Sequence, residues 1–103
     1  MGVEQLVQQI RQSTDHQSNK EMLKQQIDAD LLLPFGDGLF RVCPSLMVFL
    51  TNWPDDLVIL EDEYGNPIRC DRIQLLEKCQ ERYRQAMNRW LVDYERLCNI
   101  RKI

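Results

Sequence analysis

The sequence predicts an α+β fold in a single domain, residues 1–103, and three observations carry that prediction. Residues 1–28 are polar and rich in glutamine, with apolar residues at helical spacing. Residues 29–70 contain short apolar runs separated by glycine turns, which is typical of antiparallel hairpins. Residues 71–102 keep an apolar period of three or four residues throughout, which indicates one long amphipathic helix. A chain of 103 residues has room for one core.

The N-terminal part is expected to be helical, because apolar residues recur at helical spacing between Val3 and Ile10. Residues 13–17 contain no apolar side chain, and Ser18–Glu21 has the form of a capping box. We therefore predict either two helices, the first over residues 3–12, or one helix kinked near residue 15. The apolar stripe is thin, so the stability of this part must come from docking onto another element.

The middle part begins with a predicted hairpin. A Gly-Asp-Gly turn at residues 36–38 separates two apolar runs, and glycine reaches positive φ without a steric clash. The apolar run that follows has no diagnostic period, so a buried strand is nearly as consistent with it as a helix. Because Pro44 and Ser45 are typical of a helix start and Pro54 of a stop, we favour a helix over residues 45–52.

A second hairpin is predicted between residues 57 and 70. The run Leu57–Leu60 favours a strand, which is expected to continue through Tyr64 to a two-residue loop, Gly65-Asn66, of type II′. Pro67 has no N–H to donate to a ladder, which places its strand at a sheet edge. Together the hairpins predict a small, mostly antiparallel sheet.

The last predicted element is a helix over residues 72–101, with Asp71 as its N-cap. At 1.5 Å per residue it is roughly 45 Å long, whereas a domain of this size has a radius of gyration of about 13 Å. A small sheet cannot bury the whole stripe, so the N-terminal helices or the same helix of a second chain must cover the rest. The stripe comprises Leu76, Cys79, Tyr83, Ala86, Trp90, Tyr94 and Leu97, widened by Ile73, Met87, Leu91 and Cys98.

These side chains favour a protein–protein contact, because Trp, Tyr, Met and Arg are enriched at interfaces. We expect a small, non-catalytic interaction or assembly protein, such as an accessory or phage-encoded factor. It would form a homo-oligomer (a dimer) or bind a protein partner through the C-terminal helix. A monomer whose N-terminal helices close the stripe is the alternative. The predicted interface residues are Leu76, Tyr83, Met87, Trp90, Leu91, Tyr94 and Leu97.

Charge is distributed unevenly along the chain, which leaves nucleic-acid binding as an alternative function. The net charge is −3, but residues 72–103 carry +4 and residues 1–71 carry −7. Arginines on the last helix could contact phosphates. An isoelectric point near 5.1 and interleaved acidic residues count against this function. The possible nucleic-acid contacts are Arg82, Arg84, Arg89 and Arg96.

Candidates for catalytic chemistry are weak, and we expect no enzyme activity, no cofactor and no metal. His16 lies in the most polar part of the chain, without a Cys or Asp partner at a motif spacing, and is expected to be exposed. The glycines at 36 and 38 lie in a turn that no helix follows, which argues against a phosphate-binding loop. A metal-dependent enzyme is a distant alternative that would use the acidic turns at Asp28/Asp30, Asp55/Asp56 and Glu61–Glu63.

The cysteine pattern predicts free thiols and a reducing, cytoplasmic compartment. Cys43, Cys70, Cys79 and Cys98 have spacings unlike those of small disulfide scaffolds, and cysteine on a buried stripe acts as a small apolar residue. We find no apolar signal segment near the start of the chain. The run Leu46–Leu50 is far shorter than the roughly 20 residues that span a bilayer, so no membrane partner is expected.

Overall fold

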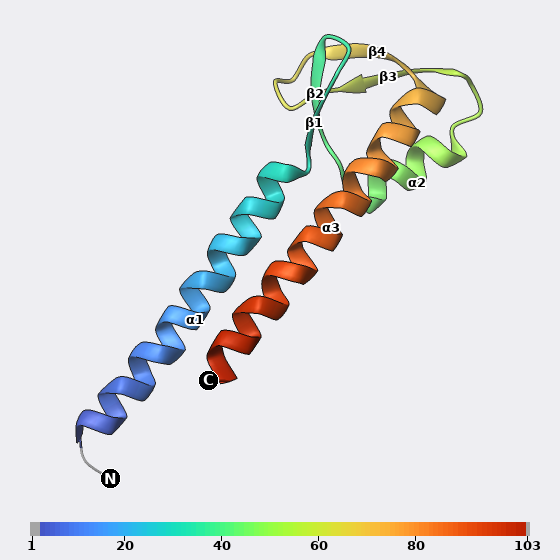
Figure 1. Ribbon diagram of the computed structural model, residues 1–103. Coiled ribbons are helices and arrows are strands. Elements are labelled where there is room, and N and C mark those ends of the chain that lie inside the picture. The colour runs from blue at the N-terminus through green and yellow to red at the C-terminus, as the bar shows by residue number, and fades with distance from the viewer. Residues whose placement is uncertain (1–2, 103) are drawn as a thin grey trace.

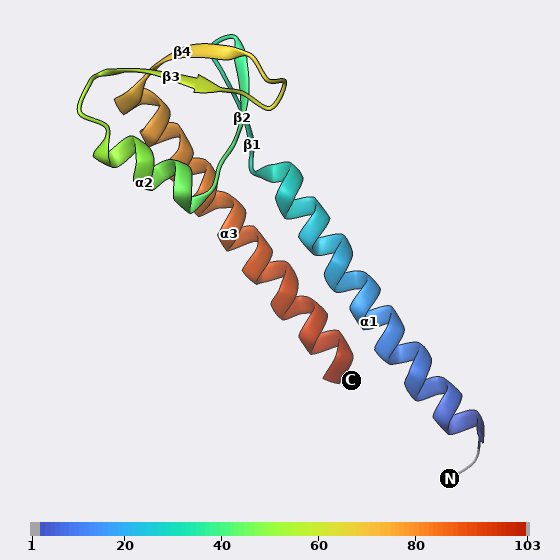
Figure 2. The same cartoon turned by 180° about the vertical axis from the view of Figure 1, so that it is seen from behind.

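The computed structural model describes the backbone of residues 3–102 and the side chains of residues 16–99. Helices α1 and α3 lie side by side and antiparallel as an arm, and the remaining elements form a head at one end (Figures 1 and 2). The chain measures 66 × 24 × 19 Å, so it is markedly elongated. The predicted α+β class with a long C-terminal helix is confirmed. The elements are α1 (Val3–Asp30), β1 (Leu32–Phe35), β2 (Gly38–Arg41), α2 (Pro44–Asn52), β3 (Leu57–Glu61), β4 (Pro67–Asp71) and α3 (Arg72–Lys102).

The N-terminal part is one continuous helix, α1, and the predicted break near residue 15 is wrong (Figure 1). Residues 13–21 contain neither Gly nor Pro, so nothing forces the backbone out of the helix, and Ser18 lies in its interior rather than at a cap. His16 is half-buried instead of exposed. Its spacing from Leu23 and Ile27 places it on the same side of α1 as these two residues.

The first hairpin is confirmed, with Leu32 opposite Arg41 and Phe35 opposite Gly38. Its two-residue turn has Gly36 at the first central position with φ +57°. A positive φ there is the requirement of a type II′ turn, and glycine meets it without strain.

The second hairpin has a longer loop than predicted. Strands β3 and β4 end with Glu61 opposite Pro67, so residues 62–66 form a five-residue loop and the two-residue Gly65-Asn66 turn is wrong. The Asp62 side chain, which accepts the N–H groups of Tyr64 and Asn66, ends the ladder early. The two hairpins form separate two-stranded antiparallel sheets.

The core of the molecule lies in the head, where both hairpins and α2 pack on the first turns of α3. The segment 45–52 lies within a helix, as favoured, and Leu50 in its last turn has no exposed surface. Residues of both sheets, of α2 and of α3 contribute to the core. The buried cluster consists of Leu33, Phe40, Val42, Leu50, Val58, Cys70, Leu75 and Cys79.

Polar contacts fix the start of α3 within the head. The Asp71 carboxylate accepts the Gln74 N–H at 3.0 Å, which confirms it as the N-terminal cap. The guanidinium of Arg72 donates to the carbonyl oxygens of Leu50 at 3.1 Å and Asp55 at 3.0 Å. These bonds tie α3 to the end of α2 and to the loop that follows, so the head fixes the direction in which the arm leaves it.

Candidate interaction surface

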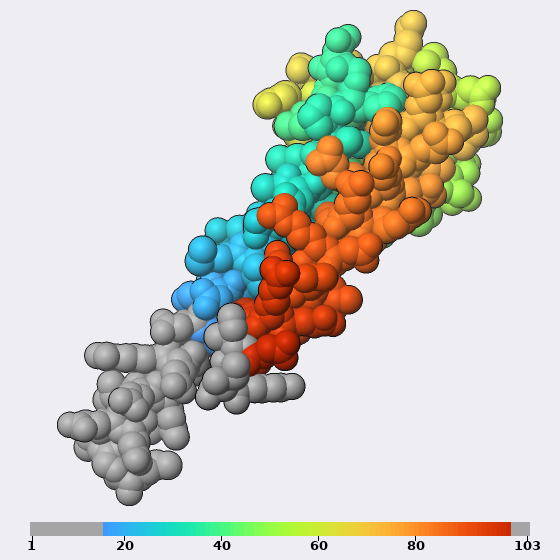
Figure 3. Space-filling view, viewed as in Figure 1, coloured from blue at the N-terminus to red at the C-terminus, as the bar shows by residue number. Residues whose placement is uncertain are grey.

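The arm is held together by an apolar seam between α1 and α3, and the space-filling view shows residues 16–30 of α1 in contact with α3 (Figure 3). Ile27 of α1 and Ala86 of α3 are almost fully buried. Leu23, Ile27 and Trp90 line the narrow space between the helices. The Lys24 ammonium lies 5.1 Å from the centroid of the Trp90 ring, a cation–π distance.

An ionic contact supplements the seam near the head. The Arg89 guanidinium lies 3.1 Å from the Asp30 carboxylate at the end of α1 and 3.9 Å from Asp93, one turn further along α3. These side chains are partly exposed, so the ion pairs contribute at most about 1 kcal/mol each. The apolar seam therefore supplies most of the binding between the two helices.

The structure divides the seven predicted interface residues into three groups. Leu76 and Tyr83 pack against the core of the head, and Trp90 and Leu97 line spaces between α3 and α1. The chain's own N-terminal helix therefore covers part of the stripe. The other three residues, Met87, Leu91 and Tyr94, form a second row on α3, which we call the flank.

The flank stays largely accessible in the single chain. The exposed fraction of the residue is 56% for Leu91 and 39% for Tyr94, and Met87 is half-buried. With 3.6 residues per turn, the flank lies roughly 90° around α3 from the row that faces α1. Two apolar rows at about a right angle are typical of a helix that packs on two neighbours, as in a four-helix bundle.

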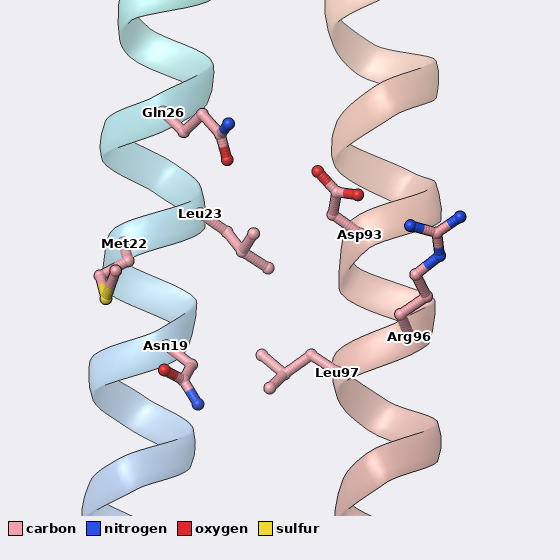
Figure 4. A pocket seen from close by; sticks show the side chains of 7 residues that line it. All are labelled: Asn19, Met22, Leu23, Gln26, Asp93, Arg96 and Leu97. Carbon is pink, nitrogen blue, oxygen red and sulfur yellow. The ribbon is translucent and has the colours of Figure 1, made fainter.

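The opposite side of the arm carries an open groove of about 530 Å³ (Figure 4). Leu23 and Leu97 point toward one another between the helices, whereas Met22 points away from α3. Charged and amide groups stand at its rim. The lining residues are Asn19, Met22, Leu23, Gln26, Asp93, Arg96 and Leu97.

The four arginines proposed as nucleic-acid contacts do not form one patch. Arg82, Arg89 and Arg96 are seven residues apart and follow one side of α3, but Arg84 lies about 120–160° away from them around the helix. Arg89 is already engaged by Asp30 and by a second carboxylate. The arrangement therefore gives nucleic-acid binding no specific support.

The titratable groups with shifted pKa values, Asp62, Cys70 and Cys79, all lie in the head, away from the flank and the groove. Burial, and then the nearby thiols of Cys43 and Cys70, raises the pKa of Cys79 to about 11, so this thiol stays protonated at neutral pH. Burial also raises the pKa of Cys70. All four cysteines are free. Among the described side chains, no group of three or more His, Cys, Asp or Glu residues is arranged to hold a metal ion.

Comparison with models of known protein families, with curated proteins and with solved structures finds no match for this chain. Within residues 3–102, no helix has an apolar stretch long enough to cross a membrane.

Sequence reasoning missed the contribution of α1 to the groove. Asn19, Met22, Leu23 and Gln26 follow a spacing of three and four residues, which places them on one side of a helix. Two of the four are amides, so an apolar pattern does not reveal them. The presence of two rows in the α3 stripe could have been found from the sequence, since 3.6 residues per turn separates them, but not which of the two rows faces α1.

Proposed function

We propose that this chain is a non-catalytic interaction or assembly protein whose arm binds a helical protein surface through the flank. One observation carries the proposal: Leu91 remains 56% exposed beside Tyr94 and Met87, on a side of α3 that its own α1 does not cover. Fully burying a leucine side chain contributes about 1.5–3 kcal/mol, so covering this row favours association.

The composition of the flank supports a binding role. Tyrosine and methionine are enriched at protein interfaces, and charged residues are depleted from interface centres. The groove on the other side of the arm has Asp93 and Arg96 at its rim, and these charges would have to be desolvated on binding. The flank is therefore the better candidate for the centre of an interface.

Site-specific photocross-linking tests the proposal. Benzoylphenylalanine replaces Leu91 in one variant and Val92 in a matched control, because Val92 is also apolar and 46% exposed but lies about 100° around α3. After irradiation in the cells from which the chain comes, we expect a defined protein adduct at position 91 and none at position 92. Adducts at neither position, or equally at both, would contradict a binding role for the flank.

A further inference from the structure

We infer that the partner of the flank is the flank of a second copy of this chain, with the two α3 helices antiparallel and the heads at opposite ends. This inference rests on the proposed function and specifies its partner. A two-fold axis between Met87 and Tyr94 would place the two flanks directly against each other, and each copy would present the same surface to the other.

Two arms can stack flank to flank in two ways, and the side chains beside the flank favour one of them. A two-fold axis along the arm places α3 over the partner's α1, whereas an axis across the arm places α3 over the partner's α3. On the flank side, α1 carries Lys24, which forms an ion pair with Asp28 at 3.7 Å. Packing Leu91 on that pair would desolvate charges, but packing it on a second flank buries apolar surface on both copies.

The charge distribution favours the same arrangement. The head with the first turns of α3, residues 29–79, holds nine carboxylate residues and four Lys or Arg residues, a net charge of −5. The rest of α3 and the end of the chain, residues 80–103, carry +3. Heads at the same end would bring two acidic surfaces together. An antiparallel pair instead brings the basic helix of each copy toward the acidic head of the other, which favours association and fixes its direction.

The available area fits a dimer of modest affinity. With the axis near Leu91, the overlap runs along α3 from about residue 80 to its end, about 33 Å, and is one to two helices, about 10–20 Å, wide. Overlapping arms would therefore bury on the order of 500 Å² on each copy, about 1,000 Å² in total, which lies at the lower end for specific interfaces. We expect a dimer whose population depends on protein concentration.

Disulfide cross-linking tests the arrangement. Met87→Cys, Leu91→Cys and Tyr94→Cys are each made in a Cys98→Ser background and oxidised at high protein concentration. In the antiparallel arrangement identical residues meet only where the axis crosses the arm, so we expect a cross-linked dimer that is strongest at one of the three positions. Val92→Cys is the matched control, and no cross-link is expected there.

The outcomes separate this inference from the proposed function. A dimeric mass without a cross-link at any flank position would overturn the antiparallel arrangement. A monomeric mass at every concentration would overturn the second copy as partner. If the mass is monomeric but position 91 forms a photo-adduct with another protein, the proposed function stands and only the second copy is excluded as partner. If the mass is monomeric and no photo-adduct forms, both the proposed function and this inference are wrong.

Discussion

The carboxylate of Asp62 accepts a hydrogen bond from the backbone N–H of Leu39, 3.3 Å away and 23 residues earlier in the chain. The same side chain accepts the N–H groups of Tyr64 and Asn66 through its other oxygen, at 3.0 and 2.9 Å. A return bond joins the Glu63 N–H to the Leu39 carbonyl at 2.8 Å. Asp62 therefore orders the β3–β4 loop and connects it to the first hairpin.

Asp62→Asn should lower the melting temperature at neutral pH. It should also make the fall of the melting temperature at acidic pH smaller. The hydrogen bonds from Asn66, and less strongly from Leu39 and Tyr64, hold the pKa of Asp62 below its ordinary value of 3.8, against the effect of burial. The folded state thus favours the carboxylate, whose contribution is present above about pH 4 and is lost as the pH falls through the lowered pKa. Asparagine keeps one acceptor oxygen but cannot accept the Leu39 N–H with its amide nitrogen.

Thermal unfolding of both proteins from pH 2 to pH 7 measures this effect, with Asp37→Asn in the exposed β1–β2 turn as the control. An unchanged melting temperature and acid profile for Asp62→Asn would show that the loop does not depend on this carboxylate.

Gly38→Ala should destabilise the fold by about 1–3 kcal/mol, the usual cost of overpacking. A Cβ atom at this position would lie 2.8 Å from Cγ1 of Ile68 and 3.2 Å from the ring of Phe40. Because Ile68 is the closest neighbour, the cost should be smaller in an Ile68→Ala background. Chemical denaturation of the four proteins measures this coupling, and equal costs in both backgrounds would refute the close contact.

The Cys79 thiol should react slowly with thiol reagents in the folded protein. Its ionisation should lower the free energy of unfolding only at alkaline pH. Its pKa is raised from 9.0 to about 11, so the unfolded chain loses this proton first and stability should decline between about pH 9 and pH 11. At pH 8 a thiol reagent should modify the half-buried Cys98 before the buried Cys79. Cys79→Ala should show a shallower alkaline decline, and an identical decline would assign it to other groups.

Leu75→Ala should lower the stability of the single chain, whereas Leu91→Ala should lower mainly the stability of the dimer. Leu75 has no exposed surface, so its truncation should cost about 2–5 kcal/mol at every protein concentration. Leu91 is 56% exposed in the single chain, so its truncation should act mainly where the dimer is populated. Denaturation at low and high protein concentration separates the two, and a concentration-independent loss for Leu91→Ala would place this residue in the monomer core.

Periodicity was sufficient to predict α3 and its Asp71 cap, because the stripe and the capping residue are local features of the chain. It failed for α1, where the polar stretch after Ile10 was interpreted as a break although it contains no Gly or Pro to end a helix. The Asp62 loop could not be predicted, since its length depends on side-chain bonds that reach Leu39 in a distant strand.

The candidate surface was only partly predictable for a related reason. The sequence identifies the apolar side of α3, but which part of it α1 covers depends on how the two helices meet. Trp90 and Leu97 proved to face α1, while Leu91 did not. A pattern on one helix cannot specify the rotation of that helix against its neighbour.

Sedimentation equilibrium of the unmodified chain from low to high micromolar concentration, beside Leu91→Glu, is the most direct test of association through the flank. We predict that the mass of the unmodified chain rises from 12.3 kDa toward twice that value. Leu91→Glu should stay at the mass of one chain while keeping the same helical content. A single-chain mass for the unmodified protein throughout, or a Leu91→Glu variant that dimerises as strongly, would contradict the account.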